Sequence, residues 1–473
     1  MTETLPTNSH AAGLLPETQD TGTMPVRFTD YRVPDPGIRD LFALEARWES
    51  WLHVEAALAR AQTRLGIIPG TAAKEIAAKA SLSCLDIPSI RRGIAATSHP
   101  LMALITELSQ TTGEKHGGWV HWGATTQNIT QTGDILQIKK AHTILTSQLR
   151  EVLSAAAGLA RKGASAVMAG RTHSQQAVPI TFGFKVAVWI DELLRHQERL
   201  TQLEPRVFNA MAGGAVGSFA SLGQQGPEVQ RLMAEDLALG SMRIPSRGIG
   251  DQFAEYVTVL ALVAATGGRI AGEIYNLMRP EIGEVREASP QGTVGSSTMP
   301  HKQNPQLSQD VLTISAQIRA NVPLALEAML QDQEVNGANT AMMDDALSRS
   351  VILTGDMLAR LQLILSQLDI DEERMRANLE ITHGLISSEA VMLSLGHIIG
   401  RQHAHDVVYE SAQEAIRTRR QFGDVLRADP AVAGHLGREQ IEELLDPLNH
   451  VGLCREIALD TAQRAEDAAT HAN

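Results

Sequence analysis

The chain has 473 residues, and its 41 lysines and arginines against 54 aspartates and glutamates give a net charge of −13. An acidic chain without a basic block gains nothing from counterion release on a polyphosphate, which argues against a nucleic-acid partner. Aromatic residues make up 4% of the chain and hydrophobic residues 43%, so the core must be mainly aliphatic. Such a composition favours closely packed helices over large β-sandwiches.

The number of cysteines and the length of the apolar runs indicate the cellular compartment of the protein. Cys84 and Cys454 are the two cysteines, which excludes a disulfide framework and fits a reducing compartment. The most apolar stretch, residues 257–265, is far shorter than the roughly 20 residues that cross a bilayer. Residues 1–25 lack a basic start followed by an apolar run, so they are expected to form a mobile arm and not a signal peptide. We therefore expect a cytoplasmic protein without membrane contact.

The hydrophobic periodicity predicts helices along most of the chain. Apolar residues from Leu41 to Leu65 recur at three- and four-residue steps and stop at Gly66 and Pro69, which indicates an amphipathic helix. Five longer helices are predicted at 135–159, 182–203, 251–278, 306–331 with a kink at Pro323, and 340–368. Helices of this length need partners to bury their apolar stripes, so they predict a bundle.

Composition and the positions of helix-breaking residues divide the chain into an arm and three helical domains. After residue 368 the pattern restarts as shorter helices, which indicates a separate small domain. The predicted units are the arm 1–25, an N-terminal domain 26–117, a central bundle 118–368 and a C-terminal domain 369–473. Three segments between helices are rich in His, Gly, Ser, Thr and Asn, and are the candidates for chemistry: 121–128, 170–179 and 289–305.

The sharpest of these signals is GTVGSSTMPHKQNP at residues 292–305. Its small residues permit a movable loop, and Pro305 suits the first turn of a following helix, whose N–H groups would favour an anion. Composition alone is equally typical of an ordinary surface loop. The string GSSTMPHKQNP, however, resembles the signature GSSxMPxKxNP of the fumarase/aspartase superfamily.

Two further segments carry the same resemblance. HWGATTQN at 121–128 is similar to the family block HxGxTSxD, and GRTHSQ at 170–175 is similar to GRTHGQ. The resemblance covers nearly the whole chain and is strongest to the branch that holds 3-carboxy-cis,cis-muconate cycloisomerase and adenylosuccinate lyase. It implies an all-α, three-domain protomer with a central long-helix bundle, a homotetrameric core and active sites shared among three chains. It also implies a small dicarboxylate substrate, no cofactor and no metal.

The family positions assign roles to individual residues. Ser296 falls at the general base and His173 at the acid that assists the leaving group. The positions implied to bind substrate are His99, Thr125, Thr126, Asn128, Ser297, Lys302 and Asn304.

The chemistry of a β-elimination fits these residue types. Removing a proton beside a carboxylate creates a dianionic aci-carboxylate, which Lys302, Asn304 and backbone N–H groups can hold without a metal. A serine is a very weak base, so Ser296 must act as an alkoxide stabilised by nearby positive charge and N–H dipoles. The ordinary pKa of a histidine suits His173 to proton transfer near neutrality. We expect a lyase that cleaves a C–N, C–O or similar bond of a substituted succinate and releases fumarate.

Several residues depart from the family pattern. Asn128 replaces an aspartate, Thr126 a serine and Ser174 a glycine. Where relatives of the branch carry Arg-Asp-Arg, this chain has Gly250 and Gln252 on either side of its aspartate, so two cations are missing. The phosphate-binding pattern of purine-type lyases is also absent from the sequence. These departures predict a substituent smaller than a nucleotide.

Two other functions remain open on the sequence. One is a carboxymuconate cycloisomerase, although ring closure needs no leaving-group acid and His173 therefore favours elimination. The other is a non-catalytic structural protein on the same scaffold, which would have no reason to keep the catalytic set. The role of His121 stays open, and a lone His99 before proline is also typical of a helix start. His403 and His405 have metal-like spacing, but no third ligand is near in sequence, so we expect packing.

Overall fold

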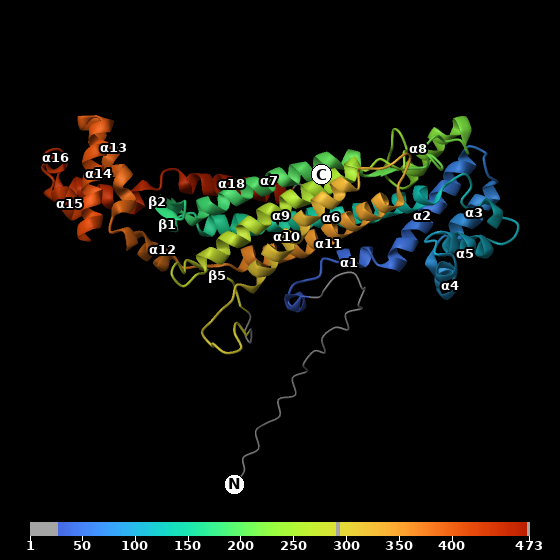
Figure 1. Cartoon of the computed structure of the whole chain (residues 1–473), viewed down its shortest axis with the longest axis horizontal. Helices are drawn as coiled ribbons and strands as arrows, with labels where there is room; N and C mark the ends of the chain where they lie inside the picture. The colour runs from blue at the N-terminus through green and yellow to red at the C-terminus, as the bar shows by residue number, and fades with distance from the viewer. Residues whose placement is uncertain (1–26, 290–293, 471–473) are drawn as a thin grey trace, which may run out of the picture.

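The computed structural model describes residues 27–289 and 294–470. The arm predicted for residues 1–25 lies outside the described residues, as do residues 290–293 of the predicted active-site loop. The described chain is overwhelmingly helical and elongated (Figure 1). The all-α prediction is therefore confirmed.

Long helices run side by side through the middle of the molecule (Figure 1). Their bounds are α6 Thr126–Lys162, α7 Phe182–Val207, α9 Asp251–Leu277, α10 Gln306–Glu327 and α11 Gly337–Gln367. All five predicted long helices are present. The largest difference is in α6, which begins at Thr126 instead of near residue 135, because its polar first turns carry no apolar stripe. Pro323 lies inside α10, and the helix ends at Glu327 instead of Gln331.

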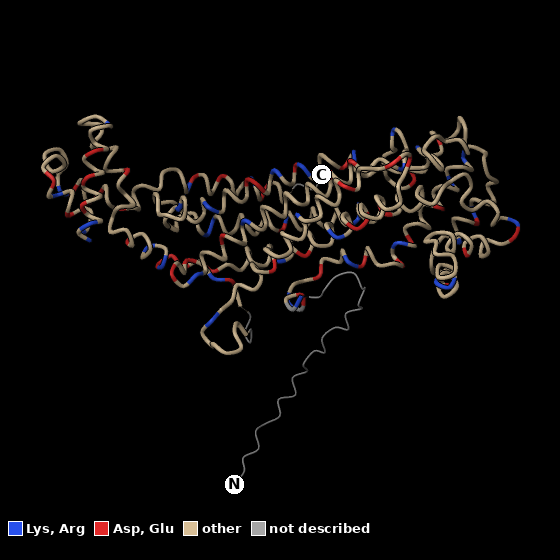
Figure 2. The backbone as a smooth tube through the Cα atoms, viewed as in Figure 1, with Lys and Arg blue, Asp and Glu red and all other residues tan. Residues whose placement is uncertain are grey.

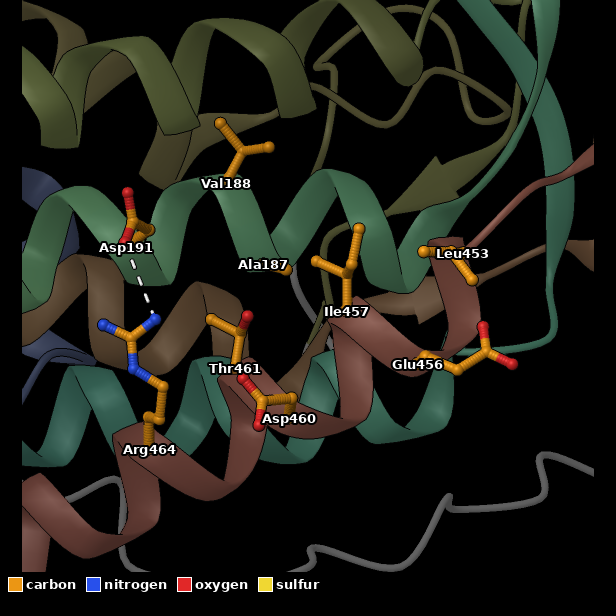
Figure 3. Close-up of a pocket in the computed structure, with 9 residues that line it drawn as sticks. All are labelled: Ala187, Val188, Asp191, Leu453, Glu456, Ile457, Asp460, Thr461 and Arg464. Atoms are coloured by element: carbon orange, nitrogen blue, oxygen red, sulfur yellow. Dashed lines mark ion pairs between the residues drawn. The ribbon is translucent and has the colours of Figure 1, made fainter.

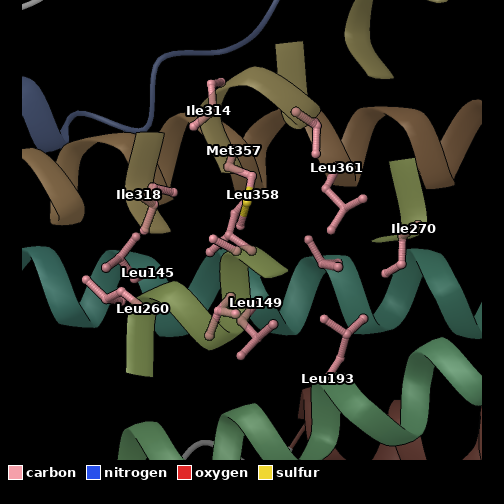
Figure 4. Close-up of a cluster of buried hydrophobic side chains, with 14 of the residues drawn as sticks. Leu145, Leu149, Leu193, Leu260, Ile270, Ile314, Ile318, Met357, Leu358 and Leu361 are labelled. Atoms are coloured by element: carbon pink, nitrogen blue, oxygen red, sulfur yellow. The ribbon is translucent and has the colours of Figure 1, made fainter. Parts of the chain in front are cut away.

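Aliphatic side chains fill the centre of this bundle (Figure 4). Fully buried leucines and isoleucines come from every long helix, for example Leu149, Leu260 and Ile314. Small residues let the helices approach closely: a Cβ added at Gly267 would lie 3.0 Å from Met357 Sδ. Close approach by glycine and aliphatic packing explain how a chain with few aromatics fills its core.

A second hydrophobic cluster forms the N-terminal end of the molecule. Its helices are α2 Leu44–Arg64, α3 Gly70–Lys79, α4 Ile87–Thr97, α5 Met102–Thr112 and α8 Gly226–Asp236. The short helix α1 Ile38–Leu41 precedes them but buries Ile38 in the central bundle. Trp48 and Leu52 of α2 are buried in the second cluster, together with Val229 and Met233 of α8. The cluster therefore joins sequence from the predicted first domain to a short helix of the central region.

A third cluster forms the opposite end. Its short helices are α13 Ser388–Ile399, α14 Arg401–Thr418, α15 Phe422–Ala428, α16 Pro430–Ala433 and α17 Arg438–Leu445. Helix α12 Glu372–Leu379 leads to this end and buries Met375 in the central cluster. The last helix, α18 Cys454–Thr470, returns along the bundle and buries Ala462 and Ala465 in its core. Figure 3 shows α18 beside α7, with Arg464 paired to Asp191 at 3.8 Å. The boundaries 117/118 and 368/369 stay our proposal for the domain division.

Short β-elements connect the helices. β1 Val167–Thr172 and β2 Gln175–Thr181 form an antiparallel hairpin, which the sequence did not predict because Gly170 and Pro179 interrupt the strand pattern. The remaining pairs have two residues per strand: β3 Asn209–Ala210 with β4 Gly240–Ser241, and β5 Val285–Arg286 with β6 Asp369–Ile370. The β5–β6 pair places the start of the predicted active-site loop beside the end of α11.

The surface charges and the most apolar helix agree with the composition. Acidic and basic residues are interspersed along the backbone of the bundle instead of forming a block of one sign (Figure 2). Helix α9 is long and apolar enough to cross a membrane by composition alone, with a mean hydropathy of 1.4. It is a central helix of the bundle, however, and 67% of that apolar window is buried within the protein.

A buried histidine in this bundle predicts acid sensitivity. His196 on α7 is 5% exposed, and its Nε2 lies 2.9 Å from Thr266 Oγ1. Burial, assisted by the charge of Arg199, lowers the pKa of His196 to about 4. The unfolded chain therefore binds an extra proton between pH 6.5 and 4, and stability falls over that range by about 3 kcal/mol. We expect His196→Gln to flatten this slope of unfolding free energy against pH, measured by chemical denaturation.

The matched control for His196 is His53→Gln, which replaces a side chain that is 51% exposed. It should leave the slope between pH 6.5 and 4 unchanged. An unchanged slope in the His196 variant would show that this ring does not couple folding to pH.

Candidate active site

The first predicted segment sits at the start of α6. Thr125 is the N-cap, and Asn128 completes a capping box by accepting the Thr125 N–H at Oδ1, 3.1 Å away. The same Oδ1 accepts the Gly214 N–H at 3.1 Å. Asn128 is 1% exposed, and its Nδ2 has no hydrogen-bond partner among the described residues. The amide thus fixes the first turn of α6, and both N–H donors of its Nδ2 have no partner among the described residues.

His99 lies against this turn. Its Nδ1 accepts the backbone N–H groups of Leu101 and Met102 at 3.3 and 3.0 Å, at the start of α5. Because that lone pair is used, the proton of the neutral ring belongs on Nε2, which is 3.4 Å from Thr126 Oγ1. His99 is therefore both a helix-start residue and a neighbour of the predicted substrate-binding threonines.

His121, whose role the sequence left open, is held by a buried acid. Its Nδ1 lies 2.6 Å from Oε1 of Glu55, a side chain that is 1% exposed. Burial lowers the pKa of His121, but the hydrogen bond and charge of Glu55 outweigh it and raise the pKa above its ordinary value. The pair ties α2 to the segment that leads into α6.

The described part of the active-site loop, residues 294–305, folds back on itself. Asn304 Nδ2 donates to the Gly295 carbonyl at 2.7 Å, and a Cβ added at Gly295 would lie 2.2 Å from the Lys302 carbonyl. Only glycine fits that approach. Ser296 Oγ accepts the backbone N–H groups of Met299 and Thr298 at 3.1 and 3.4 Å. These donors point at the oxygen that the sequence assigns as base, where they would stabilise an alkoxide.

A buried acid anchors both stems of this loop. Glu287, just after β5, is 7% exposed and accepts the N–H groups of Leu307 and Ser308 at 3.2 and 2.8 Å. A carboxylate at these positions also complements the dipole of α10. Glu287 could not be identified from the sequence, because an acid before a loop is an ordinary residue until the start of the next helix is located in space.

His173 occupies the tip of the β1–β2 hairpin, where it is exposed. The hairpin is tied near its tip to the segment that leads into the active-site loop, because Arg171 pairs with the fully buried Glu284 through two hydrogen bonds of 2.9 and 2.7 Å. His173 and Ser174 have φ angles of +50° and +63°. Positive φ at both loop positions is the pattern of a type I′ turn.

Ser174 stands in a backbone conformation that favours glycine, the residue relatives carry there. We expect Ser174→Gly to raise the free energy of unfolding by about 0.5 to 1 kcal/mol, because it removes a left-handed Cβ clash. Urea denaturation would measure the change. Ser165→Gly is the matched control: Ser165 is an exposed turn residue outside the positive-φ set, so its replacement should destabilise. Equal effects of the two changes would contradict the argument.

Within one chain the predicted residues lie at opposite ends of the bundle. Thr126 begins α6 and Lys162 ends it, so the helix is roughly 55 Å long. Lys162 Nζ donates to the Leu368 carbonyl at 3.4 Å, and the adjoining β6 pairs with β5, which leads into the loop. The hairpin and the loop stems therefore lie at the far end from Thr126 (Figure 1). The structure unites His99, Thr125, Thr126 and Asn128 but places His173 and Ser296 far from them.

Family comparisons agree with this set of segments. The family model described as Lyase matches residues 29–320, and that described as Adenylosuccinate lyase C-terminus matches residues 384–460. The chain belongs to the fumarase/aspartase superfamily. The predicted family membership and the predicted three-domain fold are thereby confirmed. Members of this superfamily are generally oligomeric.

Two curated relatives of high similarity are lyases. N-acetyl-S-(2-succino)cysteine lyase of Enterococcus italicus is 41% identical over 89% of this chain and 92% of its own. Adenylosuccinate lyase of Pyrococcus horikoshii is 38% identical over 94% of this chain and 99% of its own. These relatives confirm that the chain is an enzyme, a lyase that releases fumarate from a substituted succinate by β-elimination.

Solved structures show the same fold. A fumarate lyase from Mesorhizobium sp. BNC1 has a TM-score of 0.85 at 35% identity, covering 91% of this chain and 98% of its own. The 3-carboxy-cis,cis-muconate lactonizing enzyme of Pseudomonas putida has a TM-score of 0.86 at 30% identity, covering 94% and 100%. The cycloisomerase alternative is therefore represented by a more distant neighbour than the lyases.

Proposed function

We propose that this lyase cleaves the bond between C2 of a succinyl group and the sulfur or nitrogen of a small, amino-acid-like substituent. The geometry at Ser296 is the observation that carries the proposal, because two backbone N–H groups point at its Oγ within the loop that also supplies Lys302 and Asn304. The similarity to N-acetyl-S-(2-succino)cysteine lyase supports the choice of a small substituent. The missing cations at Gly250 and Gln252 support it as well.

In the proposed reaction the Ser296 alkoxide removes a proton from C3 of the succinyl group. The electron pair moves into the adjacent carboxylate to form an aci-carboxylate, which Lys302, Asn304 and Ser297 hold. The pair then returns to form the C2–C3 double bond of fumarate as the bond to the substituent breaks. His173 donates a proton to the departing sulfur or nitrogen. Thr125, Thr126, Asn128 and His99 bind the substrate.

The proposal requires several copies of the chain at each active site. His173 and Ser296 lie near one end of the bundle and the α6 residues near the other, so one substrate can meet them all only if different subunits contribute. Exposed apolar side chains on the long helices support such an assembly, among them Val188 on α7 and Leu262 and Tyr275 on α9. We propose a homotetramer with shared active sites, located in the cytoplasm.

The assay follows the absorbance of the fumarate double bond with three substrates. N-acetyl-S-(2-succino)cysteine should be cleaved, whereas adenylosuccinate and 3-carboxy-cis,cis-muconate should show negligible turnover. Robust adenylosuccinate cleavage would show that the small-substituent proposal is wrong. Muconate turnover without fumarate release would favour the cycloisomerase instead. Exhaustive chelation should change none of these rates, since the proposed charge stabilisation comes from Lys302 and N–H groups.

A further inference from the structure

Arg247 lies beside the first turn of α6, in the loop that leads to α9. Its Nε donates to Gln127 Oε1 at 2.9 Å, and its Nη1 donates to the Ala215 carbonyl at 2.9 Å. Gln127 in turn donates to the Arg247 carbonyl at 3.0 Å. Both hydrogen-bond partners of Arg247 lie next to the capping site of α6. Gln127 precedes Asn128 in the sequence, and Ala215 follows Gly214, whose N–H donates to Asn128 Oδ1. The guanidinium is therefore held next to the predicted substrate-binding turn.

The positive charge of Arg247 has no protein counterion in the part of the chain that the structure describes. No carboxylate of residues 27–289 or 294–470 lies within ion-pair distance of it. Both of its hydrogen-bond acceptors there are neutral oxygens, and Nη2 makes no hydrogen bond to a described residue. Burial lowers the pKa of Arg247, as expected for a guanidinium that is partly removed from water without an opposing charge.

Arg247 lines a cavity with Asp134 and Asp344, which both pair with Arg47. The start of α6 beside Arg247, in contrast, favours an anion. The backbone N–H groups and dipole at the start of α6 provide positive potential, and the buried Nδ2 of Asn128 is a donor without a partner among the described residues. An aspartate at position 128 would have placed a negative charge here. The amide removes that charge while its Oδ1 still accepts the two backbone N–H groups. This end of the bundle therefore combines an uncompensated cation with unused donors.

We propose that Arg247 determines substrate specificity by binding a carboxylate on the leaving group. The inference rests on the proposed function, in which the two succinyl carboxylates are bound by the loop and by the threonines of α6. A substrate such as N-acetyl-S-(2-succino)cysteine carries a third carboxylate, on its cysteine portion. Arg247 supplies the extra charge that this group requires, from a position three residues before Gly250, where the expected cation is missing.

The test compares substrates with and without the third carboxylate. One pair is N-acetyl-S-(2-succino)cysteine and the corresponding N-acetylcysteamine thioether; the other pair is N-(2-succino)alanine and N-(2-succino)ethylamine. We expect Arg247→Gln to lower kcat/KM about 10- to 100-fold for the carboxylate-bearing member, the range for losing a charge-assisted hydrogen bond. The decarboxylated member should change by less than about threefold. Arg247→Lys should lie between, because lysine keeps the charge but not the fork of donors.

Arg243→Gln is the matched control, because Arg243 is exposed in the same loop and should affect neither member of a pair. Equal losses for both members in the Arg247 variant would overturn the specificity role and indicate that the side chain only supports the α6 turn. Equal wild-type turnover of both members would also overturn it, with the proposed function intact. If the wild-type enzyme turned over none of the four compounds, the proposed function would be wrong, and so would the role of Arg247 that rests on it.

Discussion

Ser296→Ala is expected to reduce kcat at least about 1,000-fold while the assembly and helix content stay unchanged. The proposed base is the only group lost, and without it proton abstraction from C3 must rely on water. The change removes one oxygen from a surface loop and leaves the hydrophobic clusters untouched. Steady-state fumarate release would measure kcat, and circular dichroism with size-exclusion chromatography would report the fold.

The neighbouring serine provides a control with the same chemistry. Ser297→Ala should mainly raise KM, because Ser297 is proposed to bind a carboxylate, and it should leave kcat within about tenfold of wild type. If Ser296→Ala kept more than about a tenth of the wild-type kcat, a barrier change under roughly 1.4 kcal/mol, Ser296 would not be the base.

The sequence predicted the helices well because apolar periodicity is a local property. The stripe from Ile135 to Leu159 and the run that begins at Asp251 both correspond to helices that bury their apolar residues. The hairpin that carries His173 was missed, since its strands contain Gly170 and Pro179 and are held together by a long-range pair. The return of α18 to the bundle was also missed, because alanines at three- and four-residue steps indicate a helix but not which partner covers it.

The candidate residues were identified from the family resemblance, whereas the groups that surround and hold them could be identified only in the structure. The motif identified Ser296, but only the folded loop shows Met299 and Thr298 donating to its oxygen. Arg247 was overlooked because one arginine in a loop is an ordinary surface residue by composition. Its lack of a described counterion is a three-dimensional property. Contacts between residues distant in sequence therefore account for what could not be predicted.

The distance between the start of α6 and the active-site loop makes the proposal of shared active sites testable. From Glu287 to Ser296 a fully extended chain reaches about 30 Å, which is less than the roughly 55 Å length of α6. Thr126 and Ser296 of one chain therefore cannot act on the same substrate. Thr126→Val removes the hydroxyl that is proposed to bind a carboxylate, and we expect it to lower kcat/KM about 100-fold.

Mixing the Thr126→Val and Ser296→Ala variants should restore far more activity than the two have separately. After dissociation and reassembly of an equal mixture, each site draws its α6 start and its loop from different chains, so about one site in four is intact at both positions. Fumarate release should recover to about a quarter of the wild-type rate. A mixture of Ser296→Ala with Lys302→Ala is the control, because both changes lie in one loop and every site would keep one defect. Recovery no greater than the sum of the separate variants would show that each active site is built within one chain.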